Sequence, residues 1–218
     1  MMLGCGAQQS QEAMEALCRS MGAQRWKLSY GVTAETGEGM KKTINLVVED
    51  IAQFDIYQEK GSVTSVVALK YVALAGSSAL EGYDLLSVDA AKGGYHVKET
   101  FSVADVQLAD SLLEVVSTFI DLFQKRRYES LKALNDDVYL PDSTLNRIVG
   151  EMVRLDSVSG PMHDPKLLGF GLGQFEDKDL AVAMYRFQAP FGSQDFTNIE
   201  FQVNCANKKL SFVGVHAF

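Results

Sequence analysis

The feature that most constrains this 218-residue chain is a change of hydrophobic period between its middle and its C-terminal part. Apolar residues recur at helical spacing across Asp105 to Phe123, and they repeat most regularly across Ser143 to Leu155. A shorter helix is expected between them, from Tyr128 to Leu134. Four strand patterns then follow: Leu167 to Phe175, Ala181 to Gln188, Thr197 to Asn204 and Leu210 to Ala217. Helices followed by a run of closely spaced strands predict an α+β fold, with the helices packed on an antiparallel sheet.

The N-terminal half predicts a helix, two strands, a second helix and two further strands. Their expected bounds are Gln11 to Met21, Trp26 to Ala34, Thr43 to Val48, Ser62 to Ala75, Tyr83 to Ala90 and Tyr95 to Phe101. The second helix is rich in β-branched residues, which makes a strand its competitor, but its period, its length and the following Gly76 favour a helix. We therefore divide the chain into a tether or signal remnant (1–10), an N-terminal α+β region (11–104) and a C-terminal domain (105–218).

The net charge of the chain limits the classes of molecule that it can bind. With a formal net charge of −8 and a pI near 4.9, the chain would repel nucleic acid and anionic membrane surfaces, so no nucleic-acid partner is expected. The basic cluster at 125–127 follows an apolar helix, where cations complement the negative helix end. The sequence shows no run of about 18 apolar residues, so no membrane-spanning helix is expected.

The N-terminal residues Leu3-Gly4-Cys5 place a small residue directly before a cysteine. This resembles the lipobox that ends a bacterial lipoprotein signal, although the basic start and the apolar segment of such a signal are missing. The resemblance implies a lipid on Cys5, a polar tether after it and an extracytoplasmic location in the cell envelope, as a periplasmic or outer-membrane lipoprotein. The alternative is a free cysteine in a cytoplasmic protein. Cys18 and Cys205 are expected to be small buried side chains, with a disulfide between them as the alternative.

The order of three helices and four strands across Asp105 to Phe218 resembles the cystatin-like, nuclear-transport-factor-2-like cone. Within that superfamily, the sequence from Phe123 to Leu131 is similar to small uncharacterised bacterial domains that are often secreted. The resemblance covers about half the chain and includes no catalytic signature. It implies a C-terminal cone whose interior either holds a ligand or is filled by side chains.

Groups suited to proton chemistry are few. The three histidines, His96, His163 and His216, lack partners at metal-ligand spacing, so no metal site is expected. The glycines of residues 169–173 are followed by more strand pattern instead of a helix, which favours a bent or bulged strand over a nucleotide loop. The acidic pairs at 49–50 and 136–137 fall at element ends, where solvated caps and turns are expected. No cofactor is expected, and no catalytic residue is assigned.

The weak candidates for a ligand pocket are Tyr185, Phe187, Phe201 and His216, because cone proteins draw pocket residues from their strands. The aromatic residues are numerous enough to fill the cone, and close packing would then leave no room for a ligand. Arg186 and Glu200 should lie on the opposite sheet face as a cross-strand ion pair.

The absence of a catalytic motif favours a binding or interaction protein of the cell envelope with no enzymatic activity. Its partner would be an envelope protein or a second copy of the chain. The alternative is a small-molecule-binding protein or enzyme that uses the cone interior.

Overall fold

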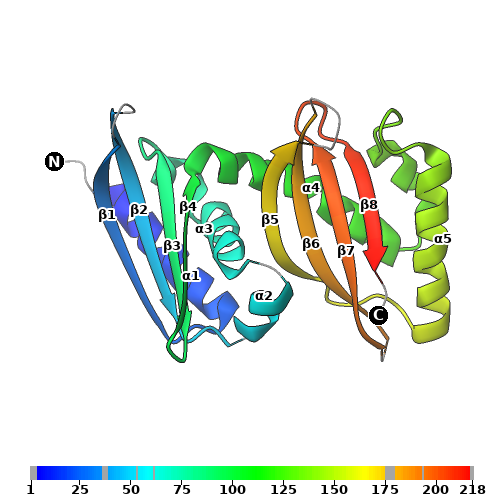
Figure 1. The fold of residues 1–218 in the computed structure, drawn as a ribbon, viewed down its shortest axis with the longest axis horizontal. Helices are drawn as coiled ribbons and strands as arrows, with labels where there is room; N and C mark the ends of the chain where they lie inside the picture. Colours follow the sequence, from blue (N-terminus) through cyan, green and yellow to red (C-terminus); the bar gives the residue numbers. More distant parts are fainter. Residues whose placement is uncertain are drawn as a thin grey trace. The chain divides into compact units, whose positions relative to one another are not determined.

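The computed structural model describes residues 4–35, 39–52, 54–60, 62–174, 180–192 and 194–216. Its elements divide into two compact units, residues 1–110 and 111–218, and each unit contains one four-stranded sheet (Figure 1). The expected α+β class, with helices packed on sheet, is confirmed. Sheet B is antiparallel as expected, whereas sheet A is mixed.

The first unit contains sheet A, with its strands in the order β1-β2-β3-β4. Its elements are α1 (Gly4–Met21), β1 (Arg25–Glu35), β2 (Gly39–Glu49), α2 (Phe54–Lys60), α3 (Val63–Leu80), β3 (Leu85–Lys92) and β4 (Tyr95–Ser102). Two antiparallel hairpins, β1-β2 and β3-β4, join through a parallel pairing of β2 with β3. The two helices between the hairpins, α2 and α3, supply the crossover that a parallel pairing requires. The expected order of elements is confirmed, and α2 is an additional helix.

Helix α1 begins at Gly4, earlier than the expected Gln11. Its buried side chains lie at helical spacing and include Ser10, Met14 and Leu17, and the helix packs against α3. The residues expected to form a polar tether are therefore partly helical.

Helix α3 corrects two expectations. The chain continues as a helix to Leu80 through a kink at Gly76, which has a φ of 70°, so this glycine does not end the helix. The segment Val63–Leu80 is also long and apolar enough to cross a membrane by length and composition, with a mean hydropathy of 1.5. Because 67% of that segment is buried inside the protein, α3 has the burial of a core helix.

The second unit contains sheet B, an antiparallel meander in the order β5-β6-β7-β8. Its elements are α4 (Val103–Gln124), which begins in the first unit, η1 (Tyr128–Leu134), α5 (Asp142–Ser159), β5 (Lys166–Gln174), β6 (Ala181–Phe191), β7 (Gln194–Asn204) and β8 (Leu210–His216). The segment η1 is a 3₁₀ helix, whereas an ordinary short helix was expected. A register shift between Leu167 and Gly169 shows that β5 is bulged, as its glycines predict.

Aromatic side chains hold α4 to sheet B. The ring of Phe119 meets Phe201 edge to face at 5.3 Å, and Phe187 meets Phe201 at 5.8 Å. Further along α4, Phe123 meets Phe191 at 6.4 Å. All of these side chains are buried, so they form the core of the second unit.

Candidate functional site

A groove runs between α5 and β8 in the second unit. Sheet B ends at β8, so the side of this strand away from β7 has no strand partner. Helix α5 runs alongside that free edge, as Figure 1 shows. The hollow between them has a volume of about 420 Å³ and is lined by residues 211–216 of β8 and by one face of α5. Residues 211–216 of β8 therefore border the groove in one continuous stretch, in which Ser211 and Val213 are buried.

The wall formed by α5 follows from helical spacing. Its lining residues are Thr144, Arg147, Ile148, Glu151, Arg154 and Leu155, which share one face of the helix. Ile148 and Leu155 are buried at the base of this wall, whereas the three charged side chains are exposed. The groove thus has an apolar base and a charged rim.

One end of the groove is fixed by the segment after η1. Asn135 is fully buried, and its Nδ2 donates to the carbonyl oxygen of Leu140 at 2.8 Å and to Oδ1 of Asp142 at 3.0 Å. The neighbouring Asp136 donates its backbone N–H to the carbonyl oxygen of Leu210 at 2.8 Å. These bonds hold Tyr139 and Leu140, which both line the groove, beside the first residue of β8.

Asp136 is buried, which corrects the expectation of a solvated turn residue. Its Oδ2 accepts hydrogen bonds from Nδ2 of Asn207 at 2.7 Å and from Nδ2 of Asn204 at 2.9 Å. Its Oδ1 accepts the backbone N–H of Val138 at 3.2 Å. The carboxylate therefore joins the segment before α5 to the β7-β8 turn, and so positions both walls of the groove.

The charges on the rim are unevenly paired. Nε of Arg154 lies 3.3 Å from Oε2 of Glu151, so these two charges compensate each other. Arg147 has no ion-pair partner among the residues that the structure describes. One uncompensated guanidinium therefore faces the groove and would favour a carboxylate on a ligand.

Three of the four predicted pocket residues lie in the core and not in the groove. Tyr185 and Phe201 face each other across β6 and β7, and Phe187 lies beside them on the same sheet face. All three are at least 93% buried. Their rings pack against the helices and against one another, in the region where the sequence suggested a cone interior.

The fourth predicted residue, His216, lines the groove at its far end. Its imidazole is 58% exposed, and its Nε2 lies 3.9 Å from Oε2 of Glu200. On the same outer sheet face, Nε of Arg186 donates to Oε1 of Glu200 at 2.9 Å, which confirms the expected cross-strand ion pair. The distance between His216 and Glu200 exceeds a hydrogen bond, so the geometry supplies no acid–base pair.

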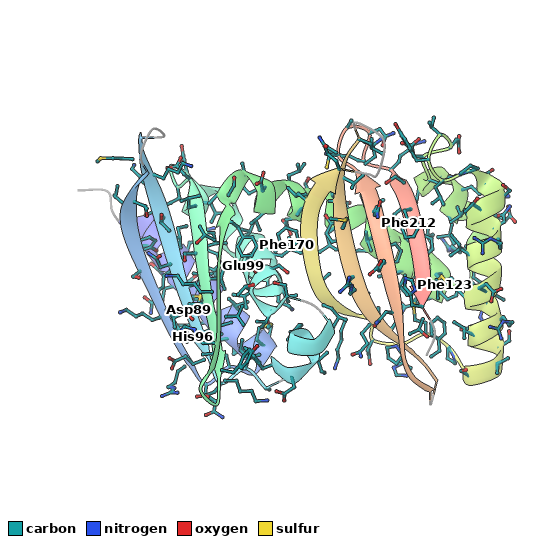
Figure 2. All side chains as sticks on the ribbon, viewed as in Figure 1. Asp89, His96, Glu99, Phe123, Phe170 and Phe212 are labelled. Atoms are coloured by element: carbon teal, nitrogen blue, oxygen red, sulfur yellow. The ribbon has the colours of Figure 1, made fainter. Side chains whose placement is uncertain are left out.

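Phe212 lies on that outer face of β8 and also lines the groove (Figure 2). A side chain at position 214 would meet the Phe212 ring, because a Cβ built there lies 2.8 Å from Cε1. Gly214 therefore allows the aromatic ring to lie along the strand at the mouth of the groove.

The other histidines lie on exposed surfaces. On sheet A, Nδ1 of His96 pairs with Oδ1 of Asp89 at 2.8 Å (Figure 2). Nε2 of His163 lies 3.0 Å from the carbonyl oxygen of Gly192. Among the described residues, no three histidine, cysteine or carboxylate side chains are grouped as metal ligands.

The predicted lipidation residue, Cys5, lies in the first turn of α1. Cys18 and Cys205 are free thiols. Burial raises the pKa of Cys18 to about 11, so this thiol stays protonated and behaves as a small apolar side chain.

No protein-family model matches the chain, no curated protein matches it, and no solved structure matches it.

Sequence reasoning missed the groove residues of α5. The apolar pattern that includes Ile148 was assigned to the core, and no role was expected for Arg147. Because Glu151 lies four residues after Arg147, the sequence favours an ion pair between them, and the pairing of Glu151 with Arg154 required the structure.

Proposed function

We propose that the protein is a binding protein that takes up an extended polypeptide segment in the groove between α5 and β8. The observation that carries this proposal is the groove along β8, because β8 is the last strand of sheet B and no described strand pairs with its side away from β7. Strand addition to a sheet edge is a general way to bind an extended peptide, because backbone hydrogen bonds supply affinity and pockets for side chains supply specificity.

The lining of the groove defines the chemistry of the occupant. Ile148, Leu155 and Val213 offer apolar contacts, so apolar side chains at alternate positions of the peptide fit the base. The unpaired guanidinium of Arg147 favours a carboxylate at the rim. The expected ligand is an extended segment with alternating apolar residues and one acidic group.

The side chains of Arg186, Glu200 and His216 on the outer face of sheet B favour a binding function over a catalytic one. Glu200 is occupied by Arg186, and His216 has no carboxylate within hydrogen-bond distance. The aromatic residues of the core, Tyr185 and Phe201, are packed against other side chains, which gives the small-molecule alternative no supporting observation.

The experiment is a selection of peptides about ten residues long, roughly the length of a strand, from a displayed random library, followed by titration of the selected peptides. Arg147→Glu should weaken binding about tenfold, because it reverses the charge that faces the acidic group. The matched control is Arg19→Glu, an exposed arginine on α1 with the same change of net charge, which should bind like the original protein. Peptides that bind both variants equally well would contradict the groove.

The lipobox-like residues support a second part of the proposal, attachment of the protein to the bacterial cell envelope through a lipid on Cys5. The three helical segments and the meander of the second unit support its assignment to the nuclear-transport-factor-2-like group. Mass spectrometry of the native protein should show a diacylglycerol on Cys5, and Cys5→Ser should move the protein to the soluble fraction. An unmodified Cys5 in the native protein would exclude the anchor.

A further inference from the structure

Strand β1 is an edge strand of sheet A that exposes several apolar side chains. It is 11 residues long, and its pairing with β2 runs from Arg25 to Glu35 without a register shift. Its other side has no strand partner, because sheet A ends at β1. Three apolar side chains on its helix-facing side are exposed: Trp26, Tyr30 and Val32, the last by 60%. A long, regular and apolar edge is the kind of edge that proteins normally pair or protect.

The opposite edge of sheet A is protected in the usual way. On β4, the polar side chains of His96, Lys98 and Glu99 are exposed beside one exposed aromatic residue, Tyr95, so this edge is mostly polar. The edge of β8 in sheet B is flanked by α5. Within the described residues, β1 exposes three large apolar side chains and no other element pairs with its free side, whereas β4 exposes only one, Tyr95.

We propose that two copies of this chain pair through β1, antiparallel, about a twofold axis at Tyr30. This pairing joins the two sheets into one eight-stranded sheet with both helix layers on the same side. In this register Leu28 of each copy lies opposite Val32 of the second copy, and the two Tyr30 side chains lie opposite each other. Directly opposite side chains in an antiparallel pair are about 5 Å apart at Cβ, so every apolar residue at the centre of the edge gains an apolar neighbour.

The charged residues at the two ends of β1 favour antiparallel pairing with a second copy of the strand. The first residues of β1 include Arg25 and Lys27, whereas Glu35 ends it. With the axis at Tyr30, residue 25 of one copy lies opposite residue 35 of the other, so the positive end of each strand meets the negative end. Arg25 already pairs with Glu49 and Asp50, but its side chain is 69% exposed and can accept a further carboxylate. A twofold contact also uses both β1 edges, so the assembly closes as a dimer and does not extend into a fibre.

The test is the molar mass of the full-length protein at micromolar concentrations, measured by light scattering and sedimentation. The expected mass is twice the 23.9 kDa of one chain. Val32→Lys should raise the dissociation constant at least about tenfold, because it places an ammonium group opposite Leu28 twice in each dimer. Val32→Ile should keep the dimer. Val158→Lys, which changes a valine exposed by 71% on α5, is the matched control and should also remain dimeric.

The fluorescence of the native protein gives a second readout that needs no variant. Trp26 is the single tryptophan and lies in the proposed contact. On dilution its emission should move to longer wavelength in step with the loss of dimer mass. A mass of one chain at every concentration would overturn the proposal. A dimer that Val32→Lys leaves intact, or that Val158→Lys disrupts equally, would overturn it too.

Discussion

At the scale of single residues, the buried carboxylate of Asp136 connects the segment before α5 to the β7-β8 turn through three hydrogen bonds. Burial alone would raise the pKa of this carboxyl group, because it disfavours the charged form. Neighbours that stabilise the charge outweigh burial and hold the pKa below its ordinary value: the side chains of Asn207 and Asn204, the backbone N–H of Val138 and the charge of Lys209. The folded protein therefore binds a proton at Asp136 less readily than the unfolded chain.

This lowered pKa gives the stability a defined pH dependence. The contribution of Asp136 is present above the unfolded pKa of about 3.9 and is lost as pH falls through the lower folded pKa. Asp136→Asn should reduce the free energy of unfolding by about 1–3 kcal/mol near pH 7, because it leaves buried amide donors facing another amide. The difference from the original protein should shrink as pH falls below 4, which urea unfolding at several pH values would measure.

The control for this pH series is Asp164→Asn, because the Asp164 side chain is 95% exposed. Its effect on unfolding should be small at every pH. A loss of stability on Asp136→Asn that stays constant down to acid pH would show that shape, and not charge, explains the role of Asp136.

At the scale of elements, α4 and α5 support sheet B through buried apolar faces. Leu112 on α4 is fully buried, and Ile148 on α5 is 92% buried. Leu112→Ala and Ile148→Ala should each lower the free energy of unfolding by about 2–5 kcal/mol, as buried large-to-small substitutions do. Chemical denaturation measures both values. If each of the two substitutions lowers the free energy of unfolding by less than about 0.5 kcal/mol, these helix faces do not stabilise the fold.

The sequence predicted elements whose pattern is local. The helical periods of α4 and α5 were sufficient to place those two helices. Helix α2 was missed because seven residues are too few to show a period. The burial of Asp136 could not be predicted, because the two asparagines that bind it lie 68 and 71 residues further along the chain.

The groove between α5 and β8 could be predicted even less than the fold, because it depends on contacts between distant parts of the chain. The strand pattern of β8 was visible, and the apolar face of α5 was visible too. Whether α5 covers the sheet face or flanks the edge of β8 depends on tertiary packing, which no local pattern contains. The groove, and the role of Arg147 in it, therefore required the structure.

At the scale of the whole molecule, the two proposed surfaces belong to different units. The β1 edge lies in residues 1–110, and the groove lies in residues 111–218. Because each unit has its own sheet and its own helices, the two functions should respond to different substitutions. Arg147→Glu should leave the dimer unchanged, and Val32→Lys should leave peptide binding unchanged.

The central claim is that a peptide adds to the free edge of β8, and hydrogen–deuterium exchange of the protein with a selected peptide tests it most directly. An added strand would protect those backbone amides of residues 211–216 that point away from β7, and exchange there should slow when the peptide is bound. Exchange of β1 should not change on peptide addition. Bound peptide with unchanged exchange in β8, and protection elsewhere in the chain, would contradict the account.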